Sequence, residues 1–226
     1  MRIRTCYELH TGKLTKPVSF GVVSDLHDEP YEDLWPLLED CDALLVPGDV
    51  VNRYTQTFDR GVGFLRDAAR RMPTFFSLGN HETKMQSFRT LMQALESTGA
   101  EILVNRYVPF GECWIGGWYD PEIVQKPDCM DGFEQLPGCR VLLCHKPEHY
   151  LKFLRSRDVD LAVAGHAHGG QIRIGSQGLY APGQHFFPKY TKGVVDGRLV
   201  ISAGAGNPCG MPRWGNPCEV LKITLD

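Results

Sequence analysis

Residues 18–27 carry the sequence Val-Ser-Phe-Gly-Val-Val-Ser-Asp-Leu-His, in which a short apolar run ends abruptly in polar residues. Four further runs have the same form, at residues 43–46, 74–78, 141–144 and 161–164. Runs of this length that are rich in Val, Leu and Phe and bounded by Gly or polar groups predict buried strands. The sequence therefore predicts a sheet whose strands all end in polar side chains.

Helix-like stretches lie between these runs. Residues 58–72 have apolar side chains at helical spacing and are followed by Pro73, which stops a helix. Similar stretches cover residues 87–97 and 147–154. Alternation of strands and helices predicts an α/β architecture with right-handed crossovers.

Two other segments predict short strands with Gly and Pro turns, and they could form a second sheet. These segments are residues 100–118 and the chain from about residue 170 onward. No linker-like stretch separates them from the rest, so we expect a single domain over residues 1–226.

The composition is that of an ordinary globular protein, since 42% of the 226 residues are hydrophobic and 23% are charged. A net charge of −3 argues against an extended nucleic-acid-binding surface. No apolar run is long enough to cross a bilayer, and residues 1–20 lack the apolar core of a signal peptide. We therefore expect a cytoplasmic protein, and the sequence leaves the oligomeric state open.

Eight cysteines are present, and none of them forms a Cys-x-x-Cys pair. Without a secretion signal, a disulfide framework is not expected. We expect most of the cysteines to be reduced, semi-buried side chains rather than metal ligands.

The polar ends of the five runs bring together carboxylate, amide and imidazole groups. They are Asp25, His27, Asp49, Asn80, His81, His145, His166 and His168. Because ligands bind at the carboxyl ends of strands in open α/β sheets, we expect these side chains to surround one crevice. Imidazole and carboxylate without thiolate suit Mn²⁺, Fe or Zn²⁺. So many donors exceed the need of one tetrahedral ion and suit two divalent ions about 3.5–4 Å apart that share a carboxylate.

Five short motifs stand in the order Asp25-Leu26-His27, Gly48-Asp49-Val50-Val51-Asn52, Gly79-Asn80-His81-Glu82, His145 and Gly165-His166-Ala167-His168. In this order and composition the chain resembles the calcineurin-like metallophosphoesterases. The second motif ends in Asn52, where many members of that family carry Asp.

The tail resembles the bacterial phosphodiesterase-like branch of the same family. The resemblance lies in Gly169-Gly170-Gln171, Tyr190, Gly193 and Pro212-Arg213. Residues 202–206, Ser-Ala-Gly-Ala-Gly, lack the arginine that this branch carries at the matching place.

The resemblance implies roles for the clustered residues. One metal would be held by Asp25, His27, Asp49 and His168, and the other by Asp49, Asn80, His145 and His166. His81 would face the substrate, where it would stabilise charge on the phosphoryl group or protonate the leaving oxygen. The implied fold is a four-layer sandwich of two mixed β-sheets flanked by helices.

Two functions follow as alternatives. The first is metal-dependent hydrolysis of a small phosphoester, as a phosphodiesterase or pyrophosphatase with a metal-bridging hydroxide as nucleophile. Its natural substrate is left open between a cyclic nucleotide, a nucleotide-sugar and a lipid-linked compound. The second is a non-catalytic metal-binding scaffold for partner proteins, against which the presence of His81 argues.

Four residues outside the motifs are candidates for substrate binding: Arg53, His185, Tyr190 and Arg213. Arg53 follows the second motif and could hold a phosphate with its guanidinium group, or it could be an ordinary surface arginine. Residues 184–190 place aromatic and basic side chains after the last histidine pair. This loop could bind substrate, contact a lipid-like leaving group, or simply pack on the surface.

Overall fold

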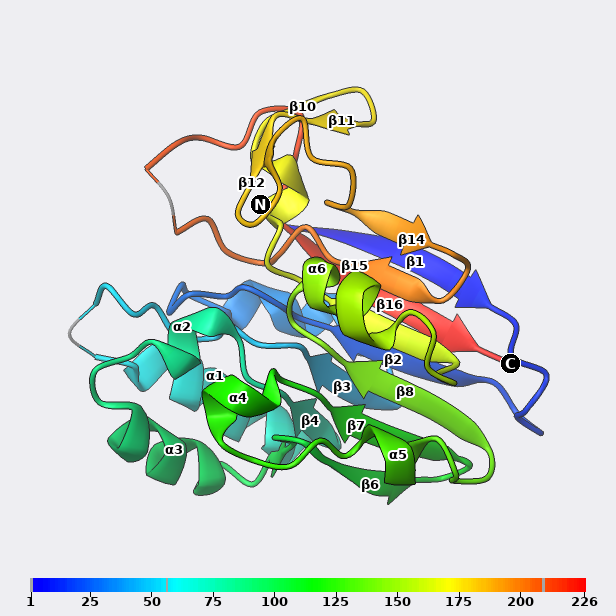
Figure 1. Ribbon diagram of the computed structural model, residues 1–226. Coiled ribbons are helices and arrows are strands. Elements are labelled where there is room, and N and C mark those ends of the chain that lie inside the picture. Colours follow the sequence, from blue (N-terminus) through cyan, green and yellow to red (C-terminus); the bar gives the residue numbers. More distant parts are fainter. Residues whose placement is uncertain (1, 56, 209) are drawn as a thin grey trace.

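Two six-stranded mixed sheets lie face to face in the computed structural model, which describes residues 2–55, 57–208 and 210–226. The strand order is β1-β16-β2-β3-β4-β5 in the first sheet and β14-β15-β9-β8-β7-β6 in the second (Figure 1). Helices cover both outer faces. The predicted four-layer α/β sandwich is therefore confirmed.

The first sheet holds three of the five predicted apolar runs, in β2, β3 and β4. Its strands are β1 (Ile3–Leu9), β16 (Glu219–Leu225), β2 (Val18–Val22), β3 (Ala43–Val46), β4 (Thr74–Phe76) and β5 (Glu101–Ile102). The pairing is parallel from β2 through β5, whereas β16 lies antiparallel to β2 and parallel to β1. Every residue of β3 is buried, as expected for an apolar strand with parallel neighbours on both sides.

The second sheet holds the other two predicted runs, in β8 and β9. Its strands are β6 (Arg106–Phe110), β7 (Cys113–Gly117), β8 (Cys139–Leu143), β9 (Leu161–Ala164), β14 (Gly193–Val195) and β15 (Leu199–Ile201). Residues 100–118 and the tail contribute β6, β7, β14 and β15 to a second sheet, as expected, and β8 and β9 form its centre. Two strands from the same segments, β5 and β16, pair in the first sheet instead.

The main core lies between the sheets. Phe20, Leu45 and Phe75 of the first sheet pack in one cluster with Val141 and Val163 of the second. Burial of these side chains is the dominant favourable contribution to folding and fixes the two sheets against each other.

Helices pack on the outer face of each sheet. On the first sheet lie the 3-10 helix η1 (Glu32–Leu37) and the helices α1 (Asp59–Arg71) and α3 (Phe88–Glu96). On the second lie α5 (Met130–Phe133), α6 (Pro147–His149) and the π-helical turn η2 (Tyr150–Leu154). The helices expected at residues 58–72, 87–97 and 147–154 are thus confirmed.

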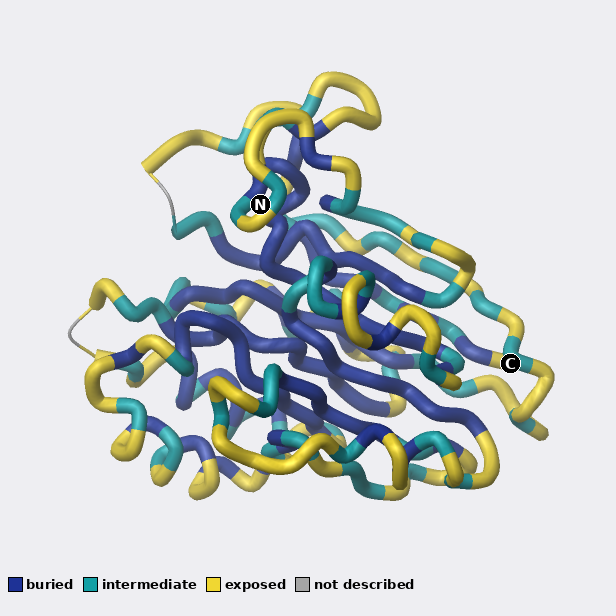
Figure 2. Tube along the Cα trace, viewed as in Figure 1, coloured by how far each residue is buried: buried dark blue, intermediate teal, exposed yellow. Residues whose placement is uncertain are grey.

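Short elements surround the carboxyl ends of the central strands. They are α2 (Asn80–Thr83), α4 (Pro121–Val124), η3 (His168–Gly170) and the strand pairs β10 (Arg173–Ile174) with β11 (Gln177–Gly178) and β12 (Tyr180–Ala181) with β13 (His185–Phe186). We call residues 171–190 the hairpin lobe. Much of this lobe is exposed where it projects beyond the sheets (Figure 2).

Within the described ranges, no helix combines the length and apolar character needed to span a membrane. The seven described cysteines are free thiols, in agreement with the expectation of reduced side chains. The eighth, Cys209, lies outside the described residues.

Candidate metal centre

The loops after β2 and β3 remain paired beyond the ends of their strands. The backbone N–H of Asp25 donates to Gly48 O at 3.1 Å, and that of His27 donates to Asp49 O at 3.1 Å. Two predicted ligand loops are therefore held side by side by their own backbones, and their side chains enter the site together.

The residues predicted from the five motifs lie together at one end of the two sheets. Asp25, His27, Asp49, Asn80, His81, His145, His166 and His168 are each at most 9% exposed. They come from both sheets, since β2, β3 and β4 precede the first five and β8 and β9 precede the last three. The site therefore forms only where the two sheets meet.

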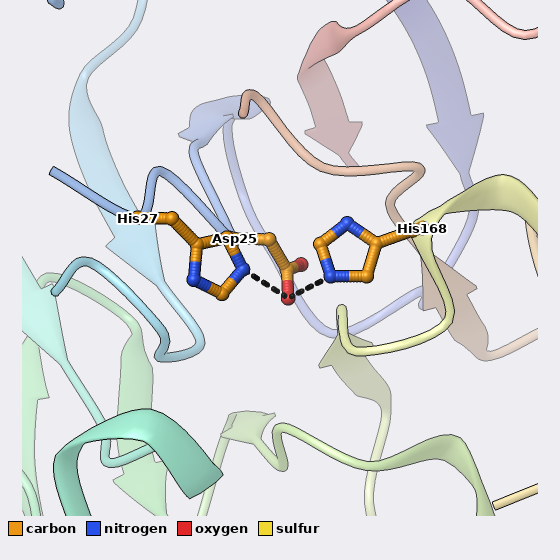
Figure 3. A group of neighbouring side chains, drawn as sticks. All are labelled: Asp25, His27 and His168. Carbon is orange, nitrogen blue, oxygen red and sulfur yellow. Dashed lines mark ion pairs between the residues drawn. The ribbon is translucent and has the colours of Figure 1, made fainter. Parts of the chain in front are cut away.

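The first group of donors consists of Asp25, His27 and His168 (Figure 3). Oδ1 of Asp25 lies 3.9 Å from Nε2 of His27 and 3.8 Å from Nε2 of His168. Two ligand atoms that each lie about 2.1 Å from one ion are separated by at most about 4.2 Å. These separations therefore fit a shared cation.

The second group consists of Asp49, His145 and His166. Oδ2 of Asp49 lies 3.2 Å from Nε2 of His145, and Oδ1 of Asn80 lies 3.3 Å from the same nitrogen. Nδ1 of His145 donates to Pro47 O at 2.8 Å, which leaves Nε2 directed at the group. A third set, His27, Asp49 and His81, overlaps both groups, so the Asp49 carboxylate lies between them.

The surroundings of the His27 side chain indicate whether a cation fits the site. Its side chain is fully buried, and among the described residues Nε2 has no partner in hydrogen-bonding geometry. Leaving a buried polar group unpaired costs about 1–3 kcal/mol. A metal ion bound by the lone pair of Nε2 would satisfy that nitrogen, so the donor set fits the divalent ions that were predicted from the sequence.

Most of the imidazoles are held neutral. Burial lowers the pKa of His27 to about 3 and that of His168 to about 4, and it lowers the pKa of His166 well below its ordinary value. A neutral imidazole offers the lone pair that a metal requires.

His145 differs from the other imidazoles. Burial would lower its pKa, but the adjacent Asp49 carboxylate outweighs burial and raises the pKa to about 9. Without metal, His145 therefore carries a proton that balances Asp49, and a cation entering this group must displace it.

The backbone at this site is held in the left-handed region. Asp25, His27, Asp49, His166 and His168 have φ values of 52°, 55°, 56°, 68° and 47°. This conformation costs of order 1 kcal/mol or more for each residue other than Gly and is concentrated at functional sites. The packing of the surrounding strands and loops holds these residues in place.

Glu82 connects the loop after β3 with the loop after β4 through hydrogen bonds to their backbones. Its buried carboxylate accepts the backbone N–H groups of Gly79 at 2.7 Å, Asp49 at 2.9 Å and Val51 at 3.2 Å. Burial, with a further contribution from Asp49, raises the pKa of Glu82 to about 7. Glu82 thus ties the loop after β3 to the start of α2.

A cavity of about 560 Å³ opens above the donors. His81 lines it beside Asp49, Asn80, His166 and His168. The backbone N–H of Arg53 donates to Nδ1 of His81 at 3.2 Å. The single proton of a neutral His81 ring is therefore on Nε2.

Three cations also line the cavity: Arg53, Lys84 and Lys146. Over residues 2–55, 57–208 and 210–226, none of the three has a carboxylate within ion-pair distance. Burial and the nearby Lys84 lower the pKa of Lys146. Neither lysine was predicted from the sequence, although each lies next to a motif, Lys84 two residues after Glu82 and Lys146 directly after His145.

The other substrate-binding candidates lie apart from this cavity. His185 is exposed on β13, and Tyr190 packs on the apolar cluster outside the second sheet. The Arg213 guanidinium lies behind the site, where Nη2 contacts Nδ1 of His168 at 3.0 Å and Nη1 donates to Ala203 O at 2.6 Å. Of the four candidates, Arg53 alone lines the cavity.

Residues 18–170 match the family model of the calcineurin-like phosphoesterases. The chain belongs to this family. The chain is also similar to curated bacterial proteins. An uncharacterized metallophosphoesterase of Campylobacter jejuni is 29% identical over 83% of this chain and 51% of its own length.

Two further relatives match more of their own length. The uncharacterized protein YpbG of Bacillus subtilis is 25% identical over 96% of this chain and 86% of its own length. Phosphodiesterase YaeI of Escherichia coli is 27% identical over 81% of this chain and 70% of its own length. The chain thus spans about half of the Campylobacter relative and most of the other two.

Proposed function

We propose that this chain is a metal-dependent phosphoester hydrolase with two divalent ions, acting on a small phosphodiester or pyrophosphate. The observation that carries the proposal is the position of Asp49 between two groups of nitrogen and oxygen donors. Asp25, His27, Asp49 and His168 would hold one ion, and Asp49, Asn80, His145 and His166 the other. Two such ions would lower the pKa of a water held between them and neutralise charge on the phosphoryl group.

A further role in the reaction falls to the side chain of His81. His81 lines the cavity and, with Nδ1 occupied by the Arg53 N–H, donates its Nε2 proton in a hydrogen bond to a phosphoryl or leaving oxygen. We assign it the role of stabilising charge that develops in the transition state. Its neutral ring makes this role a better fit than outright proton donation.

Three cations and, outside the donor groups, the Glu148 carboxylate line the cavity, and this excess of positive charge among the described residues suggests the kind of substrate. Arg53, Lys84 and Lys146 add positive charge beyond that of the ions, and they would bind negative charge beyond the scissile phosphoryl group. A substrate with two phosphates, as in a pyrophosphate linkage, supplies that charge. The similarity to phosphodiesterase YaeI of Escherichia coli supports a phosphodiester as the bond that is cleaved.

Hydrolysis of bis-p-nitrophenyl phosphate and of a nucleoside pyrophosphate by the purified chain tests the proposal. We expect cleavage with added Mn²⁺ and none after chelation. Asp49→Ala should abolish cleavage and lower bound metal, measured by plasma mass spectrometry, below that of the wild type. Asp131→Ala, which removes a carboxylate that is 92% exposed and remote from the site, is the matched control and should change neither.

An inactive chain that binds two ions would contradict hydrolysis and support the scaffold alternative. An active chain whose Asp49→Ala variant keeps its rate would contradict the role of Asp49.

A further inference from the structure

The hairpin lobe and the chain beside it expose an unusual number of large apolar side chains. They are Ile174, Tyr180, Phe186, Phe187, Met211 and Trp214, which are 74%, 42%, 70%, 70%, 51% and 69% exposed. Scattered exposed apolar residues are normal, but a group of this size on one lobe marks an interaction surface.

Contacts link these residues in two neighbouring groups, which meet where Tyr180 and Met211 line one cavity. The rings of Tyr180 and Phe186 lie 5.6 Å apart. The backbone N–H of Arg173, next to Ile174, donates to Trp214 O at 2.9 Å, so the two segments run side by side. We call the six side chains together the apolar face of the lobe.

This apolar face lies in a stretch of sequence that is free of acidic residues. Residues 161–195 and 197–218 contain no Asp or Glu, although the whole chain has a net charge of −3. Arg173, Lys189 and Lys192 lie within or next to the lobe. Lys192 pairs with Glu219 at the base, whereas the Lys189 ammonium lies 5.2 Å from the ring of Tyr190. The surface is thus apolar at its tips and basic at its flank.

We propose that the apolar face of the lobe docks on an anionic lipid bilayer. Aromatic and aliphatic side chains on loop tips, with lysine beside them, bind at the boundary between headgroups and acyl chains. Lysine adds attraction to the negative surface of such a bilayer. The Glu148 carboxylate accepts a hydrogen bond from Gln184 of the lobe at 2.7 Å. Residues 171–190 themselves carry Arg173 and Lys189 and no Asp or Glu, and this balance of charge favours an anionic partner over a cationic or neutral one.

The surface continues to the metal centre. Tyr180, Pro182 and Met211 line a cavity of about 170 Å³ together with Gln171 and His168. A docked lobe would therefore place one wall of the metal centre next to the lipid headgroups. Docking itself needs neither metal nor turnover, so its failure and a failure of the proposed hydrolysis are distinguishable.

Flotation with vesicles tests the proposal on the purified chain. We expect co-flotation with vesicles of phosphatidylcholine and phosphatidylglycerol, and weak or no co-flotation with phosphatidylcholine alone. The double variant Phe186→Ser/Phe187→Ser should lower the partition coefficient more than about tenfold, because both rings leave the interface. Lys189→Gln should lower it about fivefold at low salt and have little effect at high salt.

The matched control removes two exposed apolar side chains elsewhere. Ile123 on α4 and Phe153 on η2 are 50% and 41% exposed, and Ile123→Ser/Phe153→Ser should leave flotation unchanged. Thermal unfolding of each variant shows whether it is folded. If the wild type fails to float with anionic vesicles, or if both double variants lose flotation equally, the proposal is wrong. If sedimentation shows instead that the lobe variant loses self-association, the surface binds a second copy and not a bilayer.

Discussion

Two features of His81 determine whether its ring transfers a proton or only donates a hydrogen bond. Its Nδ1 accepts the Arg53 N–H, and burial, which outweighs attraction from Asp49, lowers its pKa. A neutral ring with its proton on Nε2 stabilises charge through a hydrogen bond, whereas a protonated ring would deliver a proton to the leaving oxygen. These two roles differ in how they depend on the leaving group.

We therefore predict that His81→Ala slows hydrolysis by about 10²–10³-fold, with a similar factor for good and poor leaving groups. The measurement is kcat/KM for diesters with p-nitrophenyl and with phenyl leaving groups, the latter a phenol with a pKa of about 10. A loss that is much larger for phenyl than for p-nitrophenyl would mean that His81 acts as a proton donor.

The loop between β4 and α2 leaves room for the Asp49 carboxylate because Gly79 has no side chain. A Cβ placed on Gly79 would lie 2.1 Å from Oδ1 of Asp49 and 2.5 Å from the Asp49 backbone nitrogen. From the first turn of α2, the backbone N–H of His81 donates to Oδ1 of Asp49 at 2.7 Å. Gly79 is needed at this position because a larger side chain would occupy the space of the Asp49 carboxylate.

Gly79→Ala should displace the Asp49 carboxylate and weaken metal binding by about 10–100-fold, the range found when groups that support a ligand are lost. Isothermal titration with Mn²⁺ measures this. Gly63→Ala on α1 is the matched control, because its Cβ would meet only the Tyr31 hydroxyl, at 3.3 Å. Equal affinity in wild type and Gly79→Ala would contradict the geometry proposed for Asp49.

For the molecule as a whole, the strained and unpaired groups at the site predict a marked response to metal. At an ion concentration 100 times the Kd, binding stabilises the folded state by about 2.7 kcal/mol. For a chain of this size, each kcal/mol shifts Tm by about 2–4 °C. We predict that chelation lowers Tm by about 5–10 °C and that Asp49→Ala, measured by scanning calorimetry, loses most of this shift. Asp131→Ala should keep it.

Much of this fold was predictable because its central strands are continuous apolar runs. β3 and β9 occupy the predicted residues 43–46 and 161–164, and α1 lies within the predicted 58–72. β1 was not predicted, although its alternation of Ile3, Tyr7 and Leu9 with Arg4 and Glu8 is the pattern of a half-exposed edge strand. Which runs share a sheet also could not be predicted, since that depends on long-range pairing.

The candidate site was predictable to the same extent and for a related reason. Residues at strand ends are brought together by the sheets, so their proximity follows from the pattern of runs. Arg213 was expected near substrate but lies behind His168, because the chain returns to the site 45 residues later along an irregular path. Lys84 and Lys146 are single lysines without a repeating pattern, and only the folded cavity shows that they point to the same ligand.

The place of β16 between β1 and β2 has a consequence for biosynthesis. β1 has no strand to pair with until β16 is made, because Ile3–Leu9 pairs with Glu219–Leu225. At a synthesis rate of about 5–20 residues per second, roughly 200 residues separate the two for about 10–40 s. During that time β1 and one edge of β2 lack their neighbour and are open to pairing with other chains. In a ribosome-bound chain, β1 and the open edge of β2 are therefore exposed to aggregation until β16 is synthesised and completes the sheet.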